Sequence, residues 1–284
     1  RVALRDGASH SVRLGLKRRK DQHSVVCSGD YMQFLGTAGG RHVVARQLRA
    51  SGGIFLRLEQ VRILMDPGPG SLVQCVKAAP PIDPANLDGI VVTHGHIDHA
   101  NDVNIIIDAM TGGGDRPRGT LFAPRPCYEG DTSVLYHYLR DFLKEIVPLG
   151  PRREYAIGNV RFRTSGAHRH SAETYGVIYR TPRVSIGFMV DTVYDPDLLD
   201  SYRGAEMLVF YATFHRRADN PSTLHYSVED AEEAIAVLRP RKAFLTHMGL
   251  SVLAAGPDRV AKKLSDKLGV EVIAAQDGMV VSLP

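Results

Sequence analysis

The sequence predicts an α/β fold in which two β-sheets pack together and helices cover their outer faces, an αββα sandwich. Three observations support this expectation. Short runs of apolar and β-branched residues alternate along the chain with longer runs of helical periodicity. Hydrophobic residues make up 44% of the 284 residues, which is ample material for an aliphatic core. No repeat, low-complexity tract or internal linker interrupts the pattern, so we expect residues 32–284 to form one domain.

The individual elements follow from this pattern. A first strand begins at Met32, and the other strand-like runs are 53–58, 61–65, 87–93, 120–123, 160–164, 176–180, 184–190, 207–211, 242–246 and 270–274, with a last strand after the Asp277 turn. The helix-like runs are 71–79, 101–110, 132–145, 227–238 and 257–268. The helix at Ser227 has the clearest start signal, because Ser227 can cap it and Asp230 follows three residues later.

The net positive charge of the chain comes from its first 31 residues. They carry seven Lys or Arg and three Asp, a net charge of 7 − 3 = +4, which equals the excess of the whole chain. The remainder is balanced, whereas surfaces that track nucleic-acid phosphates are basic. Residues 1–31 lack the apolar stretch of a secretory signal. We expect a disordered leader or a reading frame opened upstream of Met32, with a nucleic-acid-binding arm as the alternative.

Cysteine usage and hydropathy indicate the compartment. Cys27, Cys75 and Cys127 are widely spaced and odd in number, which favours free thiols in a reducing compartment over a disulfide framework. No run approaches eighteen apolar residues, so we expect no transmembrane helix. Together these features predict a cytoplasmic protein.

The most informative motif is the run His94-Gly95-His96-Ile97-Asp98-His99, which follows an apolar stretch. Three imidazoles and a carboxylate within six residues are costly in a core and serve no purpose on a solvated face. Imidazole nitrogen and carboxylate oxygen together suit zinc, with iron and manganese as the next choices. In an extended or turning segment His94 and His96 point the same way and can chelate one ion. Asp98 and His99 come round the turn and are free for a second ion.

The motif, with its preceding strand and following helix, resembles that of the metallo-β-lactamase superfamily, which implies an αββα sandwich of that type. The resemblance implies three distant ligands at strand ends. Asp191, after the run 184–190, would bridge both ions, and His247 would follow another strand. The third is a histidine shortly before a Tyr-Gly pair. Both His168 and His170 compete for that place, and we favour His170 because the six-residue step to Gly176 matches the family.

Two further stretches invite an interpretation. Asp66-Pro67-Gly68 resembles the superfamily's aspartate turn, whose carboxylate orients a metal-bound imidazole, and an ordinary β-turn is an equal alternative. The glycine-rich stretch 36–41 lacks the ending that a phosphate-cradling P-loop needs. It is similar instead to the opening F-L-G-T-x-G-G of ribonuclease Z-like proteins.

The resemblance implies a dinuclear hydrolase, with two divalent ions, Zn²⁺ in the first instance, activating a bridging hydroxide. Asp98 is then catalytic as well as a ligand. The segment 212–214 and His225 resemble the A-T-F … H-[SL]-[ST] pattern of ribonuclease Z and related phosphodiesterases, which makes His225 the general acid. The family usually has a Glu before Ala-Thr-Phe to hold that histidine, and this chain has Tyr211, which leaves the tuning of His225 in doubt.

The metal site alone does not define the substrate, so the substrate class has to be inferred from other features of the chain. Only 21 residues separate His170 from Asp191, where tRNA-processing enzymes insert a tRNA-gripping arm. We therefore expect a small phosphodiester or nucleotide-derived substrate, RNA without a dedicated exosite as a further option, no membrane, and a homodimer as the assembly. The alternatives are an acyl hydrolase (lactonase or thioesterase) and a tRNA 3′ processing endonuclease. A di-iron oxidoreductase would have a Glu in place of His96, and an intact ligand set disfavours a non-catalytic scaffold.

Overall fold

The structure is a computed structural model that describes residues 29–220 and 222–284, and it contains two mixed β-sheets. The first sheet has the order β15 (Val280–Ser282), β1 (Tyr31–Phe34), β2 (Ile54–Leu58), β3 (Val61–Met65), β4 (Gly89–Val91), β5 (Thr120–Ala123) and β6 (Glu145–Pro148). The second has the order β14 (Glu271–Ala274), β13 (Lys242–Thr246), β11 (Met207–Phe214), β10 (Ser185–Met189), β9 (Tyr175–Arg180), β8 (Val160–Ala167) and β7 (Glu154–Ile157), with β12 (Tyr226–Ser227) paired to β11.

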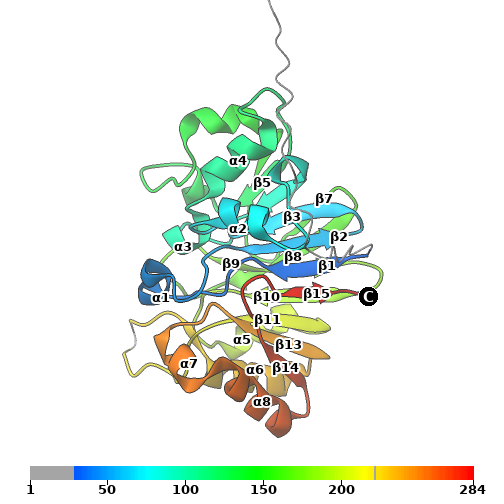
Figure 1. Cartoon of the computed structure of the whole chain (residues 1–284). Helices are drawn as coiled ribbons and strands as arrows, with labels where there is room; N and C mark the ends of the chain where they lie inside the picture. Colours follow the sequence, from blue (N-terminus) through cyan, green and yellow to red (C-terminus); the bar gives the residue numbers. More distant parts are fainter. Residues whose placement is uncertain (1–28, 221) are drawn as a thin grey trace, which may run out of the picture.

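Helices lie on the outer faces of both sheets (Figure 1). On the side of the first sheet are α2 (Ser71–Lys77), α3 (Ile97–Ala100), α4 (Val103–Thr111) and the 3₁₀ turns η1 (Pro84–Asn86), η2 (Arg125–Cys127) and η3 (His137–Phe142). On the side of the second are α5 (Pro196–Leu199), η4 (Asp200–Tyr202), α6 (Val228–Leu238), α7 (Leu250–Ala255) and α8 (Pro257–Leu268). The short helix α1 (Arg41–Arg46) lies at one end of the sandwich.

The core has three layers of buried side chains, which matches the alternation of residues along each strand. One layer lies between the sheets and includes Phe34, Phe188 and Phe244. A second lies between the first sheet and α4, and a third lies between the second sheet and α6 and α8. The αββα sandwich predicted from the sequence is therefore confirmed.

Most predicted elements are present with shifts of one to three residues at their ends, but the predicted helix 132–145 is wrong. It contains the 3₁₀ turn η3 and then β6. Leu135, Leu139 and Leu143 are buried at four-residue spacing, which produced the helical signal. Asn104 of α4 explains the difference. Its Nδ2 donates to the Val134 carbonyl and its Oδ1 accepts from the Tyr136 amide, both at 2.8 Å, so these backbone groups are bonded outside any helix.

The predicted leader, residues 1–31, lies outside the described residues except for its last three. Asp30 and Tyr31 belong to the sandwich. Tyr31 pairs with Arg57 in β1–β2, and Asp30 Oδ1 accepts from the Glu59 amide at 3.0 Å. Among the described residues, no helix is long and apolar enough to cross a membrane.

Strand directions bring the important loops together. β3, β4 and β5 run parallel in the first sheet, and β10, β11 and β13 run parallel in the second. The carboxyl ends of parallel strands meet at one edge of a sheet, and the two edges face each other across the sandwich. The segments that follow β4 and β13 lead into α3 and α7, which lie at the left of Figure 1 beside α1.

Candidate metal centre

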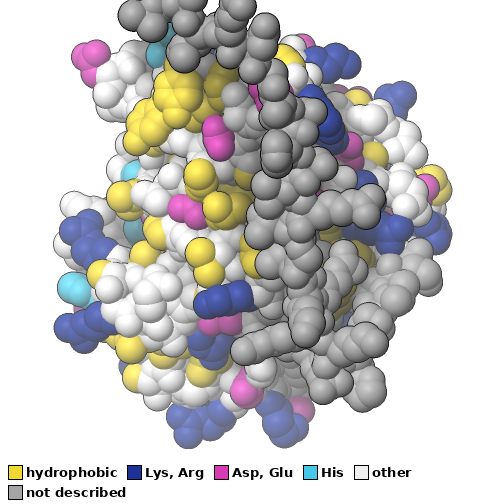
Figure 2. Space-filling view, turned by 45° about the horizontal axis from the view of Figure 1, so that its top comes forward, with side chains coloured by type: hydrophobic (Ala, Val, Ile, Leu, Met, Phe, Trp, Pro, Cys, Tyr) yellow, Lys and Arg dark blue, Asp and Glu magenta, His cyan; other side chains and the backbone are white. Residues whose placement is uncertain are grey.

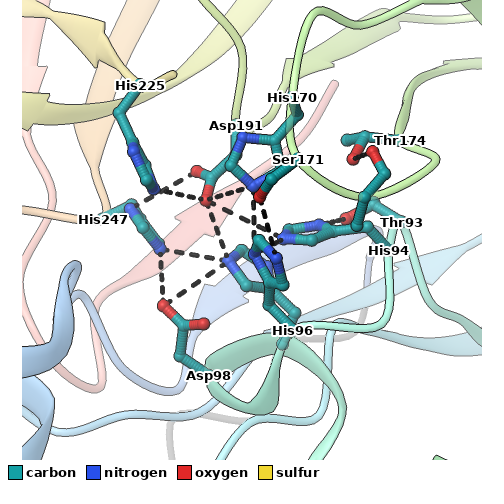
Figure 3. Close-up of polar contacts among 12 residues, drawn as sticks. Thr93, His94, His96, Asp98, His170, Ser171, Thr174, Asp191, His225 and His247 are labelled. Atoms are coloured by element: carbon teal, nitrogen blue, oxygen red, sulfur yellow. Dashed lines mark hydrogen bonds and ion pairs between the residues drawn. The ribbon is translucent and has the colours of Figure 1, made fainter. Parts of the chain in front are cut away.

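The loop after β4 brings together the first group of nitrogen atoms. His94 Nε2 lies 3.2 Å from His96 Nδ1, which in turn lies 3.0 Å from His170 Nε2 (Figure 3). His94 and His96 come from the short loop, and His170 comes from the connection between β8 and β9. These three rings form a group that could hold a metal ion. The expectation that His94 and His96 point the same way agrees with this geometry.

A second group forms on the other side of the same loop. His99 Nε2 lies 3.1 Å from His247 Nε2, and Asp98 Oδ2 lies 3.3 Å from the same His247 atom. Asp98 and His99 lie in α3, whose first turn carries them round from His96, and His247 follows β13. These residues form a second group that could hold an ion, and it contains two nitrogens and one oxygen.

Asp191 lies between the two groups. Its Oδ2 is 3.9 Å from His94 Nε2, 3.9 Å from His170 Nε2 and 3.4 Å from His99 Nε2. Its side chain is 1% exposed, and its Oδ1 has no hydrogen-bond partner among the described residues. A buried carboxylate with an unsatisfied oxygen is costly unless a cation is near. The position suits the bridging role that the resemblance implied.

Each inward-facing imidazole has a partner for its other ring nitrogen. The pairs are His94 Nδ1 with Thr93 Oγ1 (3.2 Å), His96 Nε2 with Ser171 Oγ (3.2 Å), His99 Nδ1 with Asp66 Oδ2 (3.1 Å), His170 Nδ1 with the Leu224 carbonyl (2.8 Å) and His247 Nδ1 with Thr213 Oγ1 (2.9 Å). Metal-bound histidines need such partners, which fix the tautomer and the orientation of the ring.

The spacing of the donor atoms fits a metal. Ligands about 2.1 Å from a tetrahedral zinc ion lie about 3.4 Å from one another. Four contacts within the two groups are 3.0–3.3 Å, and His99 Nε2 lies 3.8 Å from Asp98 Oδ2. Facing imidazole lone pairs repel each other at this distance unless a proton or a cation lies between them. The donor set of imidazole and carboxylate is the one expected of zinc, iron or manganese.

Asp66 has the orienting position and is not an ordinary turn residue. Its Oδ1 accepts from the Thr93 amide at 2.7 Å and its Oδ2 from the Thr93 hydroxyl at 2.9 Å, in addition to the contact with His99. Its backbone φ is +48°, in the left-handed region, and His247 has a φ of +56°. Residues other than glycine rarely adopt this conformation, and such residues cluster at functional sites.

Two glycines let the loops approach the ligands closely. A Cβ atom on Gly39 would lie 1.9 Å from the His247 carbonyl oxygen, and one on Gly68 would lie 2.0 Å from that of Asp98. Both distances are far below van der Waals contact, so any side chain would displace a ligand backbone. The glycine-rich stretch 36–41 therefore packs against the centre. This agrees with its sequence, which lacks the ending of a P-loop.

The structure separates the two competing histidines. His170 faces the centre, whereas His168 faces away: its Nδ1 is 3.1 Å from the Asp191 carbonyl and its Nε2 is 3.0 Å from the Tyr202 hydroxyl. Burial lowers the pKa of His168 to about 4, so this ring is neutral and structural.

His225 lies above the bridging position. Its Nε2 is 3.4 Å from Asp191 Oδ2, its ring packs edge-on to His170 with centroids 5.0 Å apart, and its side chain is 29% exposed. It therefore faces both the centre and solvent (Figure 3). Tyr211 does not occupy the place of a partner for His225. It lies behind His99 and His247, inside the sandwich.

The charges within the centre are strongly coupled. Burial lowers the pKa of His94 well below its usual value. Burial alone would raise the pKa of Asp191, but the His247 and His99 imidazoles hold it well below the usual range. The opposite holds for His99, where burial is outweighed by Asp98 and Asp191, which raise its pKa. The carboxylates are thus held as anions among imidazoles, as a cation site requires.

Sequence reasoning missed several supporting residues. Thr213, Ser171 and the Leu224 carbonyl orient ligands from segments far apart in the sequence. Thr213 belongs to the Ala-Thr-Phe pattern already noted, so that pattern carried a signal for His247 as well as for His225.

Comparisons with known proteins agree with this geometry. A family model described as a beta-lactamase superfamily domain matches residues 61–248. An uncharacterized protein of Methanocaldococcus jannaschii, MJ1374, is 28% identical over 257 residues, covering 88% of this chain and 94% of the relative.

Solved structures share the fold. The metallo-beta-lactamase fold protein YhfI from Bacillus subtilis has a TM-score of 0.72 at 17% identity, covering 89% of this chain and 98% of that one. Human tRNase Z, short form (ELAC1), has a TM-score of 0.64 at 18% identity, covering 89% and 99%. At these identities the likeness shows a common architecture.

Proposed function

Because the chain belongs to the metallo-β-lactamase superfamily, we propose that it is a dinuclear metal-dependent hydrolase that cleaves a small phosphodiester with His225 as general acid. The observation that carries this proposal is the placement of His225. Its Nε2 lies 3.4 Å from Asp191 Oδ2, on the exposed side of two groups of ligands that share that carboxylate.

The ligand groups assign a place to each ion. His94, His96 and His170 would hold one, Asp98, His99 and His247 would hold the other, and Asp191 would contact both. Divalent ions in such a centre lower the pKa of water and take up charge that develops on a substrate oxygen. Asp98 would contribute its carboxylate as a metal ligand. The His99 and His247 imidazoles lower the pKa of this carboxyl against the effect of burial and so keep it ionised.

His225 supplies what a phosphodiester needs beyond the metals. When the bond from phosphorus to the leaving oxygen breaks, that oxygen carries the electron pair and must gain a proton. A half-exposed imidazole beside the bridging carboxylate can donate this proton from Nε2. The Asp191 carboxylate raises the pKa of His225 against the effect of burial, which favours the protonated ring in the absence of metal.

The connection between His170 and Asp191 favours a small substrate. It consists of β9 and β10, joined as an antiparallel pair, with no inserted domain. On the face shown in Figure 2, outside the grey atoms, basic side chains are interspersed with acidic and hydrophobic ones. A substrate such as tRNA, after which the human structural neighbour is named, would need a basic surface to hold its backbone.

The proposal predicts the behaviour of His225→Ala. With zinc- or manganese-loaded protein and a dinucleotide as substrate, we expect kcat to fall by about 100-fold or more, because the alkoxide leaving group loses its acid. With bis-p-nitrophenyl phosphate, whose nitrophenolate leaves without a proton, the fall should be much smaller. Metal content, measured by elemental analysis, should stay at two equivalents. His137→Ala is the matched control, since His137 is exposed on η3, and its kcat should not change.

Two outcomes would contradict the proposal. Wild-type protein that binds fewer than two equivalents would exclude the dinuclear centre. Hydrolysis of lactones or thioesters in a parallel panel, unaffected by His225→Ala and without diesterase turnover, would assign the chain to the acyl hydrolases instead.

A further inference from the structure

Tyr211 occupies an unusual position behind the centre. It is the third inward-facing residue of β11, after Met207 and Val209, and its side chain is 4% exposed between the two sheets. Its ring stacks on His247 with centroids 5.3 Å apart and an interplanar angle of 15°. The same ring stacks on His99 at 5.9 Å and 21°. One aromatic ring thus supports both histidines of the second ligand group.

The hydroxyl of Tyr211 reaches the residue that orients His99. It lies beside the Asp66 carboxylate, whose charge adds to burial in raising the pKa of Tyr211, and both residues line the same cavity. Asp66 itself accepts from the Thr93 amide and the Thr93 hydroxyl and contacts His99 Nδ1. With the ring stacked on two ligands and the hydroxyl beside their support, Tyr211 contacts the group in two ways.

The space around these side chains makes the support necessary. A cavity of about 20 Å³ borders Tyr211, and Gly36, Gly53 and Asp66 contribute to its lining together with the ligands Asp98, His99 and His247. Rings that border a cavity lack packing on that side and can tilt into it. Tyr211 is the aromatic side chain that faces both rings from within the sandwich.

We propose that Tyr211 is a positioning residue that sets the metal affinity of the group Asp98, His99 and His247, and leaves the group His94, His96 and His170 unaffected. This inference rests on the dinuclear centre of the proposed function. It gives a role to the position where ribonuclease Z-like proteins have a glutamate. A glutamate here would add a second carboxylate to a buried site that already holds Asp66, whereas the phenol adds no charge.

Metal binding tests the proposal with Tyr211→Phe and Tyr211→Leu. Phenylalanine keeps the stacking and loses the hydroxyl beside Asp66, and leucine loses both. Outer partners of metal ligands contribute about 10–100-fold to affinity. We therefore expect Tyr211→Phe to bind the second zinc equivalent about 10-fold more weakly in chelator competition, and Tyr211→Leu to retain one equivalent after dialysis. Cobalt substitution should show that the spectrum of the first equivalent is unchanged in both variants.

Tyr179→Phe is the matched control. Tyr179 is fully buried in the same layer between the sheets, and its hydroxyl has no hydrogen-bond partner among the described residues. We expect this variant to bind two equivalents with wild-type affinity. Equal affinity in Tyr211→Phe, Tyr211→Leu and the wild type would overturn the inference, as would equal weakening in Tyr179→Phe. A wild type that binds fewer than two equivalents would instead overturn the dinuclear centre itself.

Discussion

His168 and His170 show how much one residue's orientation decides. They are separated by a single arginine, yet His170 Nε2 lies among the ligands while His168 is buried on the opposite side against Tyr202. In the extended connection after β8 the two side chains would be expected on the same face. The irregular register between Thr164 and Ala167 and the turn that follows remove that regularity.

Substitution of the two histidines should have different effects. His168→Ala removes a buried ring and the partner of the Asp191 carbonyl, whereas the Tyr202 hydroxyl keeps its bond to the Phe188 carbonyl. We expect a loss of about 2–3 kcal/mol of unfolding free energy in the metal-free protein, measured by urea denaturation. The His170 side chain is also buried, but its Nε2 lies among the proposed ligands, so His170→Ala should lower the zinc affinity of the first ligand group, whereas His168→Ala should leave that affinity unchanged. Equal weakening of zinc binding in both variants would contradict these roles.

At this scale the sequence singled out the side chains that the structure brings together, and it missed the residues that support them. The H-x-H-x-D-H spacing fixes four side chains within one turn, and Asp191 and His247 follow strands whose apolar runs are easy to recognise. The partners Ser171, Thr213 and the Leu224 carbonyl could not be predicted, because their roles arise when distant segments meet. For the same reason the sequence did not distinguish an orienting role of Asp66 from an ordinary turn, because its partner His99 lies 33 residues later.

Among the elements, α6 links helix stability to the centre. Ser227 and Asp230 form the predicted capping box: Ser227 Oγ accepts from the Asp230 amide at 3.1 Å, and Asp230 Oδ2 accepts from the Ser227 amide at 2.8 Å. The segment just before this cap contains Leu224, whose carbonyl orients His170, and His225. The start of one helix therefore fixes the approach of two functional histidines.

The capping box predicts the effect of Ser227→Ala. Loss of the cap should lower the unfolding free energy by about 1 kcal/mol, because the Asp230 amide loses its acceptor, Ser227 Oγ, and the Asp230 carboxylate loses the donor hydroxyl. Thermal or urea denaturation measures this change. Diesterase kcat should fall as well, since the segment 224–226 is less fixed. Ser222→Ala is the control, because its contact with Asn220 runs through the backbone amide, and a loss as large there would exclude the cap as the cause.

The elements also show where sequence patterns fail. Strands β3, β5 and β13 have the predicted bounds because each contains three consecutive buried apolar residues, so both faces of the strand are covered. The segment 132–145 failed because its leucines at four-residue spacing are buried by contact with α4 rather than by a helix of their own. Tertiary hydrogen bonds from Asn104 override the local pattern, and a single sequence does not show them.

At the scale of the whole molecule, the centre joins the two sheets. His94, His96, Asp98 and His99 follow a strand of the first sheet, whereas His170, Asp191 and His247 follow strands of the second. The interior between the sheets is apolar and holds them together by packing, and a metal bound at the centre would join their edges as well. Metal binding should therefore stabilise the sandwich as a whole.

Metal removal tests this coupling. A ligand that binds only the folded chain, at a concentration 1,000 times its Kd, adds about 4 kcal/mol to the free energy of unfolding. For a domain of this size we expect dialysis against a chelator to lower Tm by roughly 10 °C, and readdition of zinc to restore it. Calorimetry measures both shifts. In His94→Ala, which lacks a central ligand, the same treatment should have a smaller effect. An unchanged Tm in the wild type would mean that the folded chain holds no metal tightly.

The two ligand groups differ in their donor atoms, and this difference has a consequence for selectivity. One group offers three imidazole nitrogens, and the other offers two nitrogens with the Asp98 oxygen. Nitrogen-rich sites rank divalent ions differently from sites with carboxylate oxygen, which accept manganese and ferrous iron more readily. In the proposed dinuclear centre we therefore expect zinc to prefer the all-nitrogen position and a harder ion to prefer the position beside Asp98. The composition of such a pair would follow the supply of ions around the protein.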